Sequence, residues 1–153
     1  MTAKPILTRR RLLELGAGTV FITASPIKSY AAQSDLDQAR HTLFGERPIQ
    51  DGRVTLKLPP IAENGHSVPL SVDIDSPMTE TDYVKRVAIL SPRNPLSLIA
   101  QYHFTPQSGS AYAAGRIRLA GTQTLEAIAE MSDGTLWSGR METVVTLAAC
   151  VVL

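Results

Sequence analysis

The sequence predicts an all-β fold: an immunoglobulin-like β-sandwich, preceded by a signal segment and one short helix and followed by a C-terminal arm that carries a cysteine. Two observations support this. Segments with apolar residues at every second position recur through most of the chain, which is typical of half-buried strands. Ten glycines and ten prolines in 153 residues separate these segments, which argues against a helical bundle.

Seven strands are expected, and each places its apolar residues on one face. They span residues 54–58, 68–74, 83–90, 98–104, 111–119, 125–131 and 136–147. The sixth segment also has high helix propensity, but it alternates cleanly, with Glu126 and Glu130 facing away from its apolar residues. A tight turn at residues 132–135 follows it directly. Seven short strands at regular spacing favour two packed sheets.

One helix is expected before the strands, and it should begin at Ser34. Ser34 can cap its N-terminus, and Asp35 and Asp37 suit the positive end of the helix dipole. Its apolar stripe consists of Leu36, Ala39, Leu43 and Phe44. Gly45 should end it.

Residues 1–31 read as a signal peptide of the twin-arginine type, which directs a folded protein to the periplasm. Arg9 and Arg10 precede a modest apolar stretch, and small residues follow near Ala31 and Ala32, where cleavage is expected. The apolar stretch is too short and too polar to span a bilayer, which needs about 20 residues. The alternative, a basic amphipathic helix of the folded domain, is less favoured because Gly16, Gly18 and Pro26 interrupt it.

The charge distribution argues against a nucleic-acid partner. Residues 1–31 carry a net charge of +4, and the remainder carries −3. A mildly acidic body offers no surface that neutralises phosphates. A chain of 153 residues also excludes a multidomain enzyme.

No group of residues predicts a catalytic or metal site. His41, His66 and His103 are far apart in the sequence and share no metal-ligand spacing. No Gly-x-Ser-x-Gly motif supports a hydrolase, and we expect no cofactor. Tyr102 and Phe104 alternate as packing residues do, whereas Trp137 fits either a partner surface or the core.

The single cysteine, Cys150, is the chemical feature that a plain structural domain does not explain. In an exported protein an unpaired cysteine indicates an intermolecular bond or a free reactive thiol, although a buried apolar cysteine is equally compatible with its position. Residues 150–153 also fit the prenylation pattern. That modification is cytosolic and usually follows a basic stretch, whereas the nearest cation here is Arg140.

Short segments spread through the chain carry a family resemblance: residues 61–65, 68–70, 75–79, 94–95, 104–106, 116–120, 122–123 and 129–134. In these segments the chain resembles the SoxY family, the sulfur-carrying subunits of the bacterial Sox sulfur-oxidation system. The twin-arginine signal and the C-terminal cysteine arm resemble the family as well. The resemblance divides the chain into a signal at 1–31, a SoxY-like sandwich at 32–145 and a carrier arm at 146–153.

The resemblance implies a carrier that is not itself an enzyme. It would hold thiosulfate-derived intermediates covalently on Cys150, pair with a SoxZ-like subunit, and visit Sox-type enzymes that load and process the sulfur. No membrane attachment is implied after signal cleavage. Because no cation flanks Cys150 in the sequence, we expect the docking enzyme to activate its thiol.

The arm departs from the family pattern, which is Gly-Gly-Cys-Gly-Gly. Here Ala148, Ala149, Val151 and Val152 flank the cysteine. These residues stiffen and widen the arm, so we expect it to be more ordered than a glycine arm and to be sheltered by pairing along a sheet edge, on this protein or on its partner. The alternative function is an interaction module of a Sox-type complex that has lost or changed its cargo.

Overall fold

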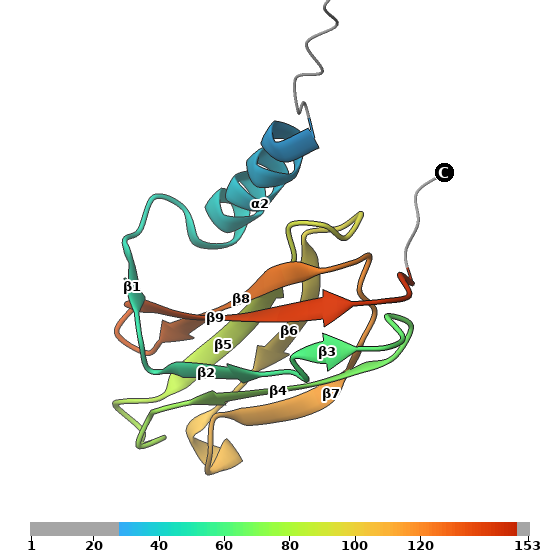
Figure 1. The fold of residues 1–153 in the computed structure, drawn as a ribbon. Coiled ribbons are helices and arrows are strands. Elements are labelled where there is room, and N and C mark those ends of the chain that lie inside the picture. Colours follow the sequence, from blue (N-terminus) through green and yellow to red (C-terminus); the bar gives the residue numbers. More distant parts are fainter. Residues whose placement is uncertain (1–27, 150–153) are drawn as a thin grey trace, which may run out of the picture.

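The computed structural model of the protein describes residues 28–149 (Figure 1). A single α-helix and nine strands make up most of this part of the chain. The elements are α2 (Lys28–Phe44), β1 (Ile49–Asp51), β2 (Val54–Lys57), β3 (Ile61–Ala62), β4 (Val68–Ile74), β5 (Val84–Leu90), β6 (Leu98–His103), the 3₁₀ helix η1 (Pro106–Ser108), β7 (Tyr112–Ile117), β8 (Gln123–Met131) and β9 (Leu136–Val145).

The strands form two packed sheets, as the sequence predicts (Figure 1). The larger sheet has the order β1-β9-β8-β5-β6, and β3 pairs with β9 outside that order; the smaller sheet has the order β2-β4-β7. All seven predicted strands are confirmed, including β8, which lies between β9 and β5. The short strands β1 and β3 were not predicted, and both pair with β9 in parallel.

The main core lies between the two sheets. Apolar residues at every second position of β4 are buried, from Val68 to Ile74, and they face Leu125, Ala127 and Ala129 of β8. Phe104 is buried in this core and Tyr102 packs against it, as their alternation predicts. Burial of this apolar surface is the main contribution to stability.

Helix α2 covers the outer face of the larger sheet with its apolar stripe, as predicted (Figure 1). Leu36 and Phe44 are buried against Leu90 and Ile128, and Ala39 and Leu43 pack around them. The predicted start at Ser34 is wrong, because the helix begins at Lys28. The preceding Ala-Ala-Gln sequence favours continued helix, so Ser34 lies inside it.

The start of α2 therefore falls within the segment 1–31 that the sequence predicts to be a signal. Its C-terminus agrees with the prediction. Gly45 adopts a left-handed φ of 68°, and its amide donates to the carbonyl of His41 over 2.8 Å. This is the conformation in which glycine commonly ends a helix.

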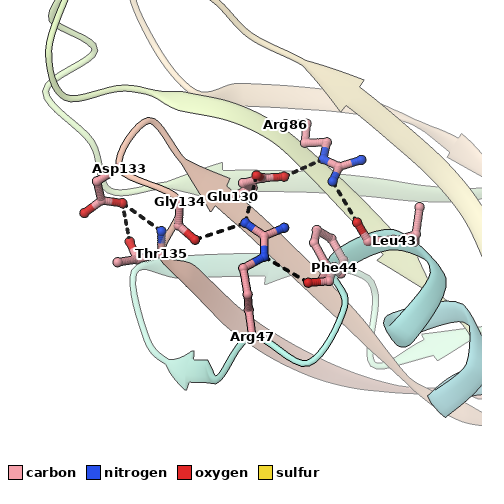
Figure 2. Close-up of polar contacts among 8 residues, drawn as sticks. All are labelled: Leu43, Phe44, Arg47, Arg86, Glu130, Asp133, Gly134 and Thr135. Atoms are coloured by element: carbon pink, nitrogen blue, oxygen red, sulfur yellow. Dashed lines mark hydrogen bonds and ion pairs between the residues drawn. The ribbon is translucent and has the colours of Figure 1, made fainter.

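Two arginines fix the last turn of α2 to the sheet (Figure 2). Arg86 donates to the carbonyl of Leu43 over 2.8 Å, and Arg47 donates to the carbonyl of Phe44 over 2.9 Å. Both carbonyls lie in the last turn of the helix, where carbonyl groups lack intrahelical partners. The positive charges also suit the negative end of the helix dipole.

The same arginines meet at Glu130 of β8. Its carboxylate accepts from Arg86 over 2.7 Å and from Arg47 over 3.0 Å. Burial alone would raise the pKa of Glu130, but the hydrogen bonds and charges of Arg47 and Arg86 outweigh it, so the pKa lies below the ordinary value of 4.5. Glu126 lies four residues earlier on the same face of β8. It is only 3% exposed and forms ion pairs with Arg40 of α2 and with Arg140. Both glutamates face away from the main core, as predicted, but they lie on the face that α2 covers.

The predicted turn between β8 and β9 is present. Asp133 accepts hydrogen bonds from the amide of Thr135 over 2.8 Å and from its hydroxyl over 2.7 Å (Figure 2). These bonds, the amide first, lower the pKa of Asp133. They fix the reversal that places β9 beside β8.

Candidate functional site

The candidate site is the end of β9, from which the arm leaves the sandwich (Figure 1). The structure describes the first part of the arm, residues 146–149. The proposed attachment residue Cys150 and the flanking Val151 and Val152 lie outside the described residues, as do Arg9 and Arg10 of the predicted export signal. The site is therefore described from residues 146–149, which lead to the cysteine.

Thr146 fixes the start of the arm through two hydrogen bonds, one to the last residue of β3 and one to the loop that follows it. Its amide donates to the carbonyl of Ala62 over 3.1 Å, and its hydroxyl donates to the carbonyl of Glu63 over 2.7 Å. On the other side of the chain, the amide of Val145 donates to the hydroxyl of Thr122 over 3.0 Å. Loops from two parts of the fold thus hold the end of β9.

Backbone pairing continues beyond Thr146 to the residue before the cysteine. The amide of Gly65 donates to the carbonyl of Leu147 over 2.7 Å, and the amide of Ala149 donates to the carbonyl of Leu119 over 3.0 Å. The amide of Leu119 in turn donates to the carbonyl of Gly65 over 2.9 Å. We call Gly65, Leu119, Leu147 and Ala149 the arm clamp. It ties the arm to the body of the same chain through Ala149.

A side-chain network supports the loop that contains Leu119. The amide oxygen of Asn94 accepts from the backbone of Ala120 over 3.0 Å, and its nitrogen donates to the carbonyl of Arg118 over 2.8 Å. Leu119 itself is fully buried in the main core. The acceptor that Ala149 uses is therefore held in place from both sides.

Exposed apolar side chains surround the root of the arm. Ile61 of β3 and Val144 of β9 are paired neighbours, and they are 61% and 43% exposed. Leu147 is 57% exposed, whereas Ala148 and Ala149 are half-buried. Exposed apolar surface of this kind suits contact with another protein.

The sequence did not single out Gly65 or Asn94 as parts of a site, and it treated Leu119 as a strand residue. A signal was available, however. Segments 61–65, 94–95, 116–120 and 122–123, which carry the family resemblance, are distant in sequence. The structure brings them together around the arm. A resemblance distributed in this way marks a shared structural element.

The other residues considered from the sequence are not members of the arm clamp, although His66 directly follows Gly65. His41, His66 and His103 contact Glu46, Asn64 and Gln101 respectively. Within residues 28–149 no three His, Cys, Asp or Glu side chains form a group that could hold a metal ion. Trp137 packs against the main core, and the Arg53 guanidinium lies 5.5 Å from the centre of its ring. No helix in this part of the chain is long and apolar enough to cross a membrane.

Comparison with known proteins identifies the family. The family described as "SoxY: Sulfur oxidation protein SoxY" matches residues 40–150. The chain belongs to the SoxY family. Among solved structures, it is similar to the sulfur carrier protein SoxY from Chlorobium limicola f thiosulfatophilum, with 30% identity and a TM-score of 0.64; the match covers 75% of this chain and 99% of that one. Both results support a sulfur-carrier role, and the SoxY match ends at the cysteine.

More distant structures share the fold of this SoxY family member. A superoxide reductase (neelaredoxin) from Ignicoccus hospitalis is 17% identical, with a TM-score of 0.55 and coverage of 61% of this chain and 80% of that one. A superoxide reductase from Nanoarchaeum equitans is 14% identical, with a TM-score of 0.53 and coverage of 62% and 99%. At these identities the likeness shows the sandwich alone. Comparison with curated proteins gave no match.

Proposed function

We propose that this protein carries sulfur compounds covalently on Cys150 and is not itself an enzyme. The observation that carries the proposal is the position of the cysteine. It is the only cysteine in the sequence, and it directly follows Ala149, the last residue that the arm clamp holds. A thiol at this position directly follows a segment that is hydrogen-bonded to the body of the protein. Such an arrangement suits presentation to a separate enzyme.

The covalent step defines what a partner must supply. Joining thiosulfate to the thiol of Cys150 forms a sulfur–sulfur bond and releases one proton and two electrons. The electrons must pass to an oxidising partner, which we take to be a Sox-type redox enzyme. Thiolate is the reactive form of cysteine, and an ordinary cysteine is mostly protonated near neutrality. Activation by the docked enzyme keeps the carrier inert between encounters.

We further propose a periplasmic location, reached by the twin-arginine route, and a SoxZ-like subunit as permanent partner. The paired Arg9 and Arg10 support the first proposal. Exposed apolar residues support the second. Leu98 is the first residue of β6, an edge strand of the larger sheet, and Leu96 lies just before it; they are 36% and 76% exposed. Apolar side chains at an open sheet edge are typical of a surface that another protein covers.

A second candidate is an interaction module that keeps the partner surface but carries no sulfur. The substitution of alanine and valine for the glycines of the family arm favours it. Retention of Cys150 favours the carrier.

Reaction with tetrathionate tests the carrier proposal, because a carrier requires an accessible and reactive thiol at Cys150. A reactive thiol displaces thiosulfate from tetrathionate and retains the other half as a thiosulfonate, so no further oxidant is needed. For a carrier, intact mass spectrometry of the reduced protein should show one such addition, removable by a reductant and absent from Cys150→Ser. An unmodified wild-type protein, or the same addition on Cys150→Ser, would contradict the proposal.

A further inference from the structure

We propose that Gly65 is the positioning residue of the arm, because its backbone fixes the chain up to Ala149 and so sets the distance that Cys150 can travel. The inference rests on the proposed carrier function. In the arm clamp Gly65 donates to Leu147 and accepts from Leu119, and Leu119 accepts from Ala149. One residue, Gly65, therefore contacts both the arm and the loop that follows β7.

The arm clamp has room only for glycine at this position. A Cβ atom on Gly65 would lie 2.5 Å from the carbonyl oxygen of Leu119, 2.9 Å from that of Leu147 and 3.1 Å from the amide nitrogen of Ala149. All three neighbours are backbone atoms, which cannot rotate away as a side chain can. Close approach of backbones is one of the physical reasons for glycine at a fixed position. Any side chain here must separate the arm from the loop.

The arm is the part that would move. The Leu119 side chain is fully buried, and Asn94 holds the residues on both sides of it. Thr146 is held separately by Ala62 and Glu63. Between these fixed points, Leu147 is 57% exposed and is attached through its carbonyl group. A side chain at residue 65 would therefore displace residues 147–149 and leave Thr146 in place.

The arm clamp consequently gives the carrier two ranges. When it is closed, residues 147–149 are held on the body of the protein. When it is open, residues 147–149 add about 10 Å to the reach of the sulfur, at roughly 3.3 Å per residue. An enzyme that pairs with the backbone of Leu147 and Ala149 would replace the hydrogen bonds of the arm clamp with its own. The cysteine would thus be extended on docking and kept near the body otherwise.

Gly65→Ala tests this inference, with Gly109→Ala as the matched control. Gly109 has a left-handed φ of 73°, and a Cβ there would meet nothing within 4 Å. The control therefore lowers stability through backbone strain alone, at the opposite end of β7 from the arm. Each variant is compared with wild type in three measurements: thermal unfolding, hydrogen exchange of the Ala149 amide, and the rate at which a bulky maleimide alkylates Cys150.

In Gly65→Ala, exchange at Ala149 and alkylation of Cys150 should each rise by about twofold to tenfold, which is the effect of losing one hydrogen bond on a local opening equilibrium. Amides of β8 should exchange as in wild type. Gly109→Ala should change thermal unfolding but neither arm measurement. Unchanged exchange and alkylation in Gly65→Ala, or equal increases in Gly109→Ala, would overturn the inference.

If Gly65→Ala does not fold, Ala149→Pro tests the arm clamp from the other side. Proline removes the amide that donates to Leu119, whereas Ala149→Ser keeps it. Faster alkylation in the proline variant alone is expected, and equal rates in both would refute the inference. Hydrogen exchange at Ala149 and alkylation of Cys150 do not require bound sulfur. Loss of the tetrathionate reaction would therefore contradict the carrier function and leave the arm clamp intact.

Discussion

The amide of Gly65 donates to the carbonyl of Leu147 over 2.7 Å, although the two residues are 82 positions apart in the chain. This contact places the first part of the arm on the body of the protein. Together with the bond from Ala149 to Leu119, it holds the arm on the body as far as Ala149. The alanines that replace the family glycines are thus compatible with an arm that is paired at its root.

Asn94 should control the arm from a distance, because it holds the loop that contains Leu119. Asn94→Ala removes both the acceptor for Ala120 and the donor to Arg118, and we expect it to lower the free energy of unfolding by about 1–3 kcal/mol. Exchange at the Ala149 amide should also become faster. Asn94→Asp keeps the acceptor and should give an intermediate effect. Equal exchange at Ala149 in wild type and Asn94→Ala would show that the loop does not support the arm.

Glu130 should make stability depend on acidic pH. Its folded pKa lies below 4.5, so its stabilising contribution is complete above that value and is lost as the pH falls through the folded pKa. Glu130→Gln should cost about 1–2 kcal/mol near neutral pH, since hydrogen bonds from two arginines to a carboxylate are weakened. Urea unfolding from about pH 7 to about pH 3 measures both effects.

The difference between wild type and Glu130→Gln should shrink as the pH falls. Exposed Glu80 offers a control for the loss of one negative charge, through Glu80→Gln. A gap between wild type and Glu130→Gln that stays constant down to the lowest pH would contradict the assignment.

Leu36 should anchor α2 to the sheet, because it is only 6% exposed and packs in the cluster with Leu90 and Ile128. Leu36→Ala removes this packing, and we expect a loss of about 2–4 kcal/mol in the free energy of unfolding. Gln38→Ala, an exposed change on the same helix, should stay within about 0.5 kcal/mol of wild type. Urea unfolding compares them, and similar values for both would mean that the helix does not stabilise the sandwich.

Local sequence patterns were sufficient for the strands and for the packed face of the helix. The alternation in residues 68–74 corresponds to β4 at both ends, and the stripe from Leu36 to Phe44 faces the sheet. The start of the helix was mispredicted because a capping residue at Ser34 competes with a preceding sequence that is itself helical. Capping preference is a weak signal when the flanking residues also favour helix.

Features that depend on distant contacts could not be predicted in this way. Strands β1 and β3 span three and two residues, too short to show a period, and they exist because they pair with β9. The buried carboxylate of Glu126 accepts a hydrogen bond from Arg40 of α2, which is 86 positions away in the chain. The role of Gly65 depends on Leu119 and Leu147 in the same way. The family resemblance covers β3, Gly65 and Leu119, but not β1, Glu126 or Leu147.

The carrier function is tested most directly by the mass of the C-terminal peptide from protein isolated out of cells that oxidise thiosulfate. We expect that peptide to bear a sulfur-containing addition on Cys150 that a reductant removes, and we expect Cys150→Ser, expressed in the same cells, to lack it. A wild-type peptide that stays unmodified during thiosulfate oxidation, or an equal addition on the serine variant, would contradict the function proposed for this protein.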